Sequence, residues 1–145
     1  MKNTRKDELN QALEAIHFGF RTLTEKPDER LAEMTYSRVH HRVLYFIARH
    51  PQSSINELLE VMGVSKQYLN RPLRQLTEDA YINVKVDTAD KRVKRVSLTK
   101  KGEKLEAELS GEQRKRFEKV FKQAGPQSEA GWRKVMTLLV DSATR

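Results

Sequence analysis

The stretch SINELLEVMGVSKQYLNRPLRQL, residues 54–76, decides the fold because it encodes two short helices joined by a tight turn. Ser54 and Glu57 form a Ser-x-x-Glu capping box ahead of an apolar helical pattern, which predicts where the first helix begins. Gly63 ends that helix, since glycine readily adopts the left-handed conformation that other residues avoid. Ser65 is then placed to cap the second helix.

The second predicted helix has one apolar and one polar face. Leu69, Leu73 and Leu76 recur at helical spacing and form an inward stripe. The side chains on the other face are cationic or carry an amide, namely Lys66, Gln67, Asn70, Arg71 and Arg74. Such groups read base edges and bind phosphates. A solvated face on a small helical pair is the alternative, and the segment that follows favours the first interpretation.

A proline interrupts the backbone pattern of this second helix. Pro72 lacks the N–H of an interior helical residue and clashes with the preceding turn, at a cost of about 3 kcal/mol or more. Because Leu73 and Leu76 continue the apolar stripe, the sequence predicts a bend near residues 68–72 rather than a break.

After the second helix the apolar period changes to two. Ile82, Val84 and Val86 alternate with polar residues. A second such run, residues 93–98, follows the charged segment DTADKR, residues 87–92. This pattern predicts a β-hairpin with a charged tip.

This order of parts resembles the winged helix-turn-helix domain of the MarR (multiple antibiotic resistance regulator) family of bacterial transcription factors. The similarity covers roughly residues 37–104 and lies in three pieces, ELLEVMGVSKQYLNRPLRQL, DTADKR and SLTKKG. The chain departs from the family pattern at Ala89, where members often have arginine. It departs again at Ala80, where they usually have glycine before the first wing strand.

The resemblance implies a mainly α fold with a small β-hairpin wing. Residues 37–98 would form the winged helix-turn-helix lobe that binds DNA, and residues 1–36 and 99–145 the helical dimerisation regions. In the first of these we expect a helix over residues 4–24. Lys26-Pro27-Asp28 then interrupts the helical pattern, and residues 29–36 would form a short helix or a loop.

The C-terminal region has two helical patterns. We expect a long helix over residues 100–123, interrupted at Ser110-Gly111, and a last helix that begins at Ser128. The last pattern is apolar over more than one stripe and needs cover on two sides, which a partner subunit would supply.

Residue roles follow from the chemistry of the side chains and from the resemblance. Gln67, Asn70 and Arg71 are the candidates for base contacts. The candidates for phosphate contacts are Lys66, Arg74, Lys91 and Lys94. Ser65 is a further candidate DNA-binding residue. The resemblance implies that Asp90 braces the wing through a neighbouring arginine. It also implies that Arg92 reaches the minor groove, where a narrow groove concentrates negative potential. The alternative is that these charged side chains only keep the hairpin tip soluble and do not contact DNA.

Many members of the family bind small anionic or aromatic molecules between the dimerisation helices and the DNA-binding lobe. By this resemblance the candidate residues of such a cleft are Phe20, Tyr36, His40 and His41. The alternative is that these side chains simply pack or meet solvent.

Charge supports a nucleic-acid partner. The chain has a net charge of +8 and a pI near 9.8. Residues 65–104 hold eleven Lys and Arg against five Asp and Glu, whereas the rest holds seventeen against fifteen. Basic charge is therefore concentrated where phosphates are expected. The low hydrophobic content of 37% also suggests that long helices complete their core against a second copy.

Other classes of function lack sequence support. There is no cysteine, which excludes disulfides and thiolate metal sites. His40 and His41 are adjacent, so on a helix they point about 100° apart and do not form an i, i+4 metal pair. No phosphate-binding loop, hydrolase motif or apolar run of roughly 20 residues occurs. We therefore expect no catalytic activity, cofactor, metal or membrane contact, and a cytoplasmic location.

The sequence predicts a homodimeric regulator that binds a pseudo-palindromic site in double-stranded DNA. Its two recognition helices would lie in successive major grooves, about 34–36 Å apart. A small aromatic or anionic effector would modulate it. The alternative is a winged-helix module that binds protein or RNA without operator specificity.

Overall fold

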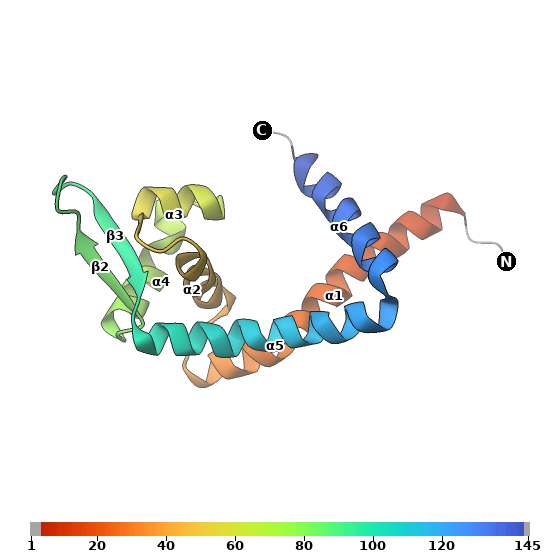
Figure 1. Ribbon diagram of the computed structural model, residues 1–145, viewed down its shortest axis with the longest axis horizontal. Helices are drawn as coiled ribbons and strands as arrows, with labels where there is room; N and C mark the ends of the chain where they lie inside the picture. Colours follow the sequence, from red (N-terminus) through yellow and green to blue (C-terminus); the bar gives the residue numbers. More distant parts are fainter. Residues whose placement is uncertain (1–3, 144–145) are drawn as a thin grey trace. The chain divides into compact units, whose positions relative to one another are not determined.

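The computed structural model describes residues 4–143 and confirms the predicted mainly α fold with a small antiparallel sheet (Figure 1). Its elements, in chain order, are α1 (Arg5–Glu33), α2 (Arg38–Arg49), β1 (Ser53–Ser54), α3 (Ile55–Met62), α4 (Lys66–Glu78), β2 (Ile82–Val86), β3 (Lys94–Leu98), α5 (Lys100–Ala124) and α6 (Pro126–Asp141). The chain divides into two compact units, one ending at Glu112 and the other beginning at Gln113. The ends of the expected dimerisation regions, residues 1–3 and 144–145, lie outside the described residues.

The helix-turn-helix forms from the predicted local signals. The hydroxyl of Ser54 accepts a hydrogen bond from the backbone N–H of Glu57 at 3.1 Å, and the Glu57 carboxylate accepts one from the backbone N–H of Ser54 at 3.3 Å. Gly63 ends α3 at φ 66°, in the left-handed region. The hydroxyl of Ser65 caps α4 by accepting from the backbone N–H of Tyr68 at 3.1 Å. These bonds satisfy backbone donors that a helix start leaves unpaired.

The wing is a hairpin of β2 and β3, and it gains a third strand that the sequence did not predict. Val84 pairs with Val96 across the hairpin, and β1 pairs with the other edge of β3, so the strand order is β1-β3-β2. A strand of two residues carries no alternation that a period of two could reveal. The β1 pairing ties the wing to the chain just ahead of α3.

The core lies where α2, α4, the sheet and the first half of α5 meet. Its fully buried side chains include Leu44, Ile47, Leu58, Leu69, Leu76, Val96 and Leu109. The predicted stripe of Leu69, Leu73 and Leu76 is buried, and Pro72 is buried beside it. Helix α4 continues through Pro72 without a break, as expected.

Three predicted helix boundaries were wrong. Lys26-Pro27-Asp28 does not interrupt the first helix, because α1 runs through Pro27 with Leu31 fully buried one turn later. Ser110-Gly111 does not interrupt α5. The last helix begins at Pro126 rather than Ser128, in keeping with the preference of proline for the first helical turn. In the first two cases burial against other elements outweighs a weak local helix propensity.

The SLTKKG segment joins the wing to α5 through a close backbone approach. The N–H of Thr99 donates to the carbonyl of Tyr81 at 3.1 Å, and the hydroxyl of Thr99 accepts from the N–H of Gly102 at 3.0 Å. A Cβ on Gly102 would lie 2.0 Å from the Tyr81 oxygen. Glycine is therefore required here for contact rather than for an unusual φ.

Candidate nucleic-acid interface

The polar face of α4 is exposed as the helical period predicts. Its cationic and amide side chains are all solvent-exposed: Lys66, Gln67, Asn70, Arg71 and Arg74. The leucines on the opposite face of α4 are buried in the core. Their packing fixes the rotation of the helix, so these polar side chains stay at the surface. The Ser65 side chain serves as the N-cap of α4. The structure thus brings six of the nine predicted DNA-binding residues onto α4 and its N-cap.

The wing tip carries the remaining three residues. Lys91, Arg92 and Lys94 are exposed between and along the hairpin strands. Arg92 forms a bidentate ion pair with Asp90, with N–O distances of 3.1 and 3.2 Å, while its own side chain stays 90% exposed. Asp90 therefore orients the arginine that was expected to reach the minor groove, and its hydrogen bonds to Arg92 lower the pKa of the Asp90 carboxyl.

A second arginine ties the wing to the helix-turn-helix. Arg95 of β3 donates to the Asp87 carboxylate at 2.8 Å, to the carbonyl of Gln52 at 3.1 Å and to the Glu57 carboxylate at 3.4 Å. Because Glu57 caps α3, Arg95 links the hairpin to the start of the first helix of the motif.

Asp87 completes this link at the wing tip. Its second carboxylate oxygen accepts from the backbone N–H groups of Ala89 at 3.0 Å and Asp90 at 2.8 Å. The hydrogen bond from Arg95 is the main cause that lowers the pKa of Asp87. An aspartate that opens a turn and bonds the backbone two residues on is a recognisable local signal, but its arginine partner eight positions away is not.

The four predicted cleft residues do not line one cavity. Tyr36 and His40 lie together, their rings stacked with centroids 4.3 Å apart. His40 Nδ1 accepts from the backbone N–H of Ser37 at 3.0 Å, which leaves Nε2 as the donor to the Gln75 side chain at 2.7 Å. A hollow of about 280 Å³ lies beside this pair and is also lined by Arg71 of α4.

His41 and Phe20 lie elsewhere. His41 is buried and its Nε2 bonds the hydroxyl of Ser110 on α5 at 3.0 Å. Phe20 is half exposed on α1 with the guanidinium of Arg38 over its ring at 5.1 Å. Neither residue lines the hollow beside Tyr36 and His40. Adjacency in sequence puts His40 and His41 on different sides of α2. The role of these four residues in ligand binding stays a prediction.

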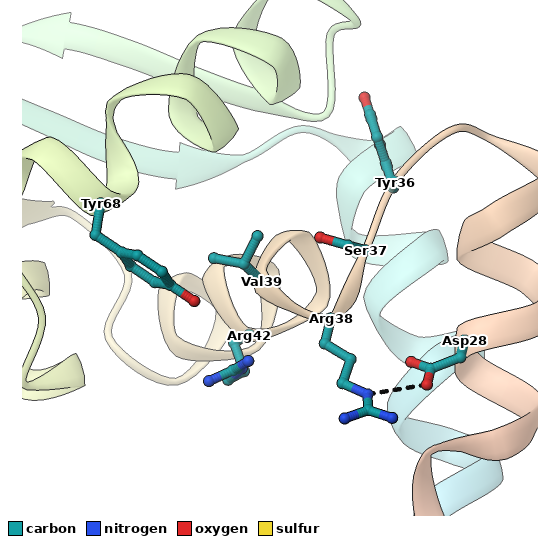
Figure 2. Close-up of a pocket in the computed structure, with 7 residues that line it drawn as sticks. All are labelled: Asp28, Tyr36, Ser37, Arg38, Val39, Arg42 and Tyr68. Atoms are coloured by element: carbon teal, nitrogen blue, oxygen red, sulfur yellow. Dashed lines mark hydrogen bonds and ion pairs between the residues drawn. The ribbon is translucent and has the colours of Figure 1, made fainter.

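A larger open hollow of about 470 Å³ lies between the start of α2 and the start of α4. It is lined by Asp28, Tyr36, Ser37, Arg38, Val39, Arg42 and Tyr68 (Figure 2). Arg38 donates to the Asp28 carboxylate at 2.9 Å. Figure 2 shows the Tyr68 hydroxyl pointing from α4 toward α2, where the Arg42 side chain lies.

His41 belongs to a buried polar cluster between α2 and α5. Glu106 pairs with Arg49 at 2.9 Å, and its other carboxylate oxygen is buried without a partner among residues 4–143. Burial lowers the pKa of His41, and the nearby Glu106 opposes that shift without reversing it. The described part of the chain contains no group of three or more His, Asp or Glu side chains suited to a metal ion. Within that part, no helix is both long and apolar enough to cross a membrane.

A helix-turn-helix whose second helix exposes a polar face, followed by a β-hairpin, defines the class of winged helix-turn-helix proteins. A family model described as MarR family matches residues 34–93. The HTH-type transcriptional regulator PetP of Rhodobacter capsulatus is 42% identical over 139 residues, covering 96% of this chain and 84% of the relative. The chain belongs to the MarR family, and it is a transcriptional regulator rather than an enzyme.

Solved structures share the fold at low identity. The MarR family transcription regulator SP03579 has a TM-score of 0.77 at 19% identity, covering 94% of this chain and 90% of that one. The S. aureus MepR–DNA complex has a TM-score of 0.73 at 18% identity, covering 98% and 100%.

Proposed function

We propose that the protein regulates transcription by binding a pseudo-palindromic site in double-stranded DNA as a homodimer in the cytoplasm. The observation that carries this proposal is the outer face of α4, where cationic and amide side chains are exposed while the inner leucines are buried. The MepR structure, which has the same fold, was solved with DNA. Net charge of +8, concentrated near α4 and the wing, supports a polyanionic partner.

The proposed contacts divide by their chemistry. Gln67, Asn70 and Arg71 contact base edges, since amides suit adenine and a guanidinium suits guanine. Arg92, oriented by Asp90, enters the minor groove. The remaining exposed cations bind phosphates: Lys66, Arg74, Lys91 and Lys94.

Exposed apolar side chains support the homodimer. On the first half of α1, Leu13 is 71% exposed, and on α6 Leu138 and Val140 are 61% and 68% exposed. Apolar surface of this kind on helices at both ends of a chain commonly marks an interface. A second copy would cover these faces and give the twofold symmetry that a palindromic site requires.

We also propose that a small aromatic or anionic effector binds beside Tyr36 and His40. The hollow there is lined by Arg71, a proposed base-reading residue, and by Gln75, which His40 bonds directly. A ligand in this position could displace α4 side chains needed for DNA. It regulates only if it binds the free and DNA-bound forms with different affinity.

Equilibrium binding to the duplex upstream of the protein's own gene, to a random duplex and to single-stranded RNA tests the main proposal. We expect tighter binding to the upstream duplex, and Arg71→Ala should weaken it by about 1–3 kcal/mol with little effect on the random duplex. Lys91→Ala is the matched control, because loss of a phosphate contact weakens both duplexes alike. Equal affinity for all three nucleic acids would instead favour an interaction module without operator specificity.

A further inference from the structure

The larger hollow beside α4 contains a positive charge that the function described so far does not use. Arg42 is exposed, and none of the ion pairs among residues 4–143 involves it. Arg38, one turn earlier on α2, is instead neutralised by Asp28 at 2.9 Å. The acidic residue at the rim therefore does not cancel the charge of Arg42.

The hollow also faces the correct side of the recognition helix for a backbone contact. Tyr68 follows Gln67 in α4, so its side chain points about 100° around the helix from Gln67. When Gln67 faces base edges in the major groove, Tyr68 faces a wall of that groove, where a sugar–phosphate backbone runs. Figure 2 shows its hydroxyl directed across the hollow toward α2.

The start of α2 adds a favourable field. Ser37, Arg38 and Val39 at its first turn line the hollow, and a helix N-terminus carries a partial positive charge. A guanidinium, a phenolic hydroxyl and a helix start that converge on one open hollow suit an oxyanion.

We propose that this hollow is a phosphate-binding site for the backbone of bound duplex DNA, with Arg42 and Tyr68 as its ligands. This inference rests on the proposed function and extends the interface from α4 and the wing to α2. Arg42 supplies the charge and Tyr68 donates a hydrogen bond to the same phosphate.

Binding of the full chain to a random-sequence duplex over a range of KCl concentrations tests the inference, because phosphate contacts do not depend on base sequence. Each phosphate neutralised contributes about 0.9 to the slope of log K against log [salt]. Arg42→Ala should therefore reduce the slope by about 0.9 for each copy of the site engaged, and Arg42→Lys should restore most of it. Tyr68→Phe should weaken binding about two- to tenfold with the slope unchanged, since an uncharged donor is lost.

Arg21→Ala is the matched control, because it removes the same charge from an exposed position on α1 that does not line the hollow. Thermal unfolding of each variant checks that the fold is intact. A slope unchanged in Arg42→Ala, or reduced equally in Arg21→Ala, would overturn the inference while duplex binding by the wild type upholds the proposed function. Absence of any duplex binding by the wild type would overturn both this inference and the proposed function.

A parallel melt in inorganic phosphate, at the ionic strength of a chloride control, separates a backbone phosphate from a free anion. Stabilisation of the wild type that Arg42→Ala abolishes, together with an unchanged salt slope, would assign the hollow to a free oxyanion and overturn the commitment to DNA.

Discussion

Ala80 occupies a backbone conformation that favours glycine. Its φ is 64°, directly after α4, and the N–H of Tyr81 donates to the carbonyl of Leu76 at 2.9 Å in the manner of a Schellman cap. The left-handed backbone conformation costs a residue with a Cβ roughly 1–2 kcal/mol. The structure thus gives a physical reason for the glycine that the family usually has before the wing.

We therefore expect Ala80→Gly to raise the free energy of unfolding by about 0.5–1 kcal/mol, after the entropy that glycine loses on folding. Urea unfolding would measure the change. Ala107→Gly, at an exposed position inside α5, is the control and should lower stability by about 1 kcal/mol. Equal destabilisation by both substitutions would show that the left-handed conformation carries no strain.

His41 makes stability depend on pH through its burial. Its folded pKa lies below the ordinary value of 6.5, because burial disfavours the charged ring. The contribution of the neutral ring to stability is thus fully present above pH 6.5, and it is lost as pH falls from there through the lower folded pKa.

We expect wild-type protein to lose stability as pH falls below about 6.5, and His41→Gln to lose less over the same range. Thermal unfolding across this pH range would measure the difference between the two proteins. His17→Gln, at an exposed position on α1, should keep the wild-type dependence. If His41→Gln also keeps that dependence, the titration of another group is responsible.

At the scale of elements, the wing is held by two acidic residues with different partners. Asp87 bonds Arg95 and two backbone N–H groups, whereas Asp90 bonds Arg92 alone in its side-chain ion pair. Arg95 in turn reaches Gln52 and Glu57 outside the hairpin. Asp87 therefore fixes the hairpin to the helix-turn-helix, and Asp90 acts on Arg92.

We expect Asp87→Asn to loosen the wing tip, because the amide replaces an acceptor oxygen and removes the charge that pairs with Arg95. Amide hydrogen exchange at Ala89 and Asp90 should become several-fold faster than in wild type. Asp90→Asn is the matched control and should leave the Ala89 amide protected. The reverse ranking would make Asp90 the main brace of the wing, as the family resemblance implied.

The elements that could be predicted from sequence are those whose signals are local. The Ser54–Glu57 capping box, Gly63 and the alternation in β2 act within a few residues, and they placed the helix-turn-helix and the hairpin. The continuity of α1 through Pro27 could not be predicted, because the contacts that hold it come from distant residues. Among these is the ion pair of Arg30 with Glu108 on α5, at 2.9 Å.

The candidate site also combines features that local sequence predicts with features that depend on distant residues. The exposure of Gln67, Asn70 and Arg71 follows from helical period alone, so the sequence placed this face correctly. The partners of Arg95 lie on β1, α3 and the wing tip, and no sequence spacing brings them together. Helical period alone separates His41 from His40, but the sequence does not show locally that the His41 side of α2 packs against α5.

At the scale of the whole molecule, α6 leaves its apolar side chains uncovered within one chain. Trp132 contacts Phe117 and Phe121 of α5, yet Val135, Leu138 and Val140 are each more than 60% exposed, at 62%, 61% and 68%. A sequence with 37% hydrophobic residues has few to spare for solvent. Their position on one short helix supports the proposed homodimer.

We expect sedimentation to give a dimer for the wild type, and Leu138→Glu to weaken the dimer by at least about 2 kcal/mol, since an unpaired charge would be buried. Lys134→Glu, on an exposed polar position of the same helix, should leave the dimer largely intact. A wild-type monomer at micromolar concentration would contradict the proposed homodimer. An unchanged dimer in Leu138→Glu would place the interface elsewhere.

The central claim is that exposed α4 and wing side chains, presented by two copies of the chain, read duplex DNA. Footprinting on the intergenic DNA beside the protein's own gene tests it most directly. The account predicts two protected half-sites related by a twofold axis, with centres about 10–10.5 bp apart. It also predicts that Arg71→Ala needs a higher protein concentration than the wild type to give this footprint. Protection without twofold symmetry, or a footprint that Arg71→Ala leaves intact, would contradict the claim.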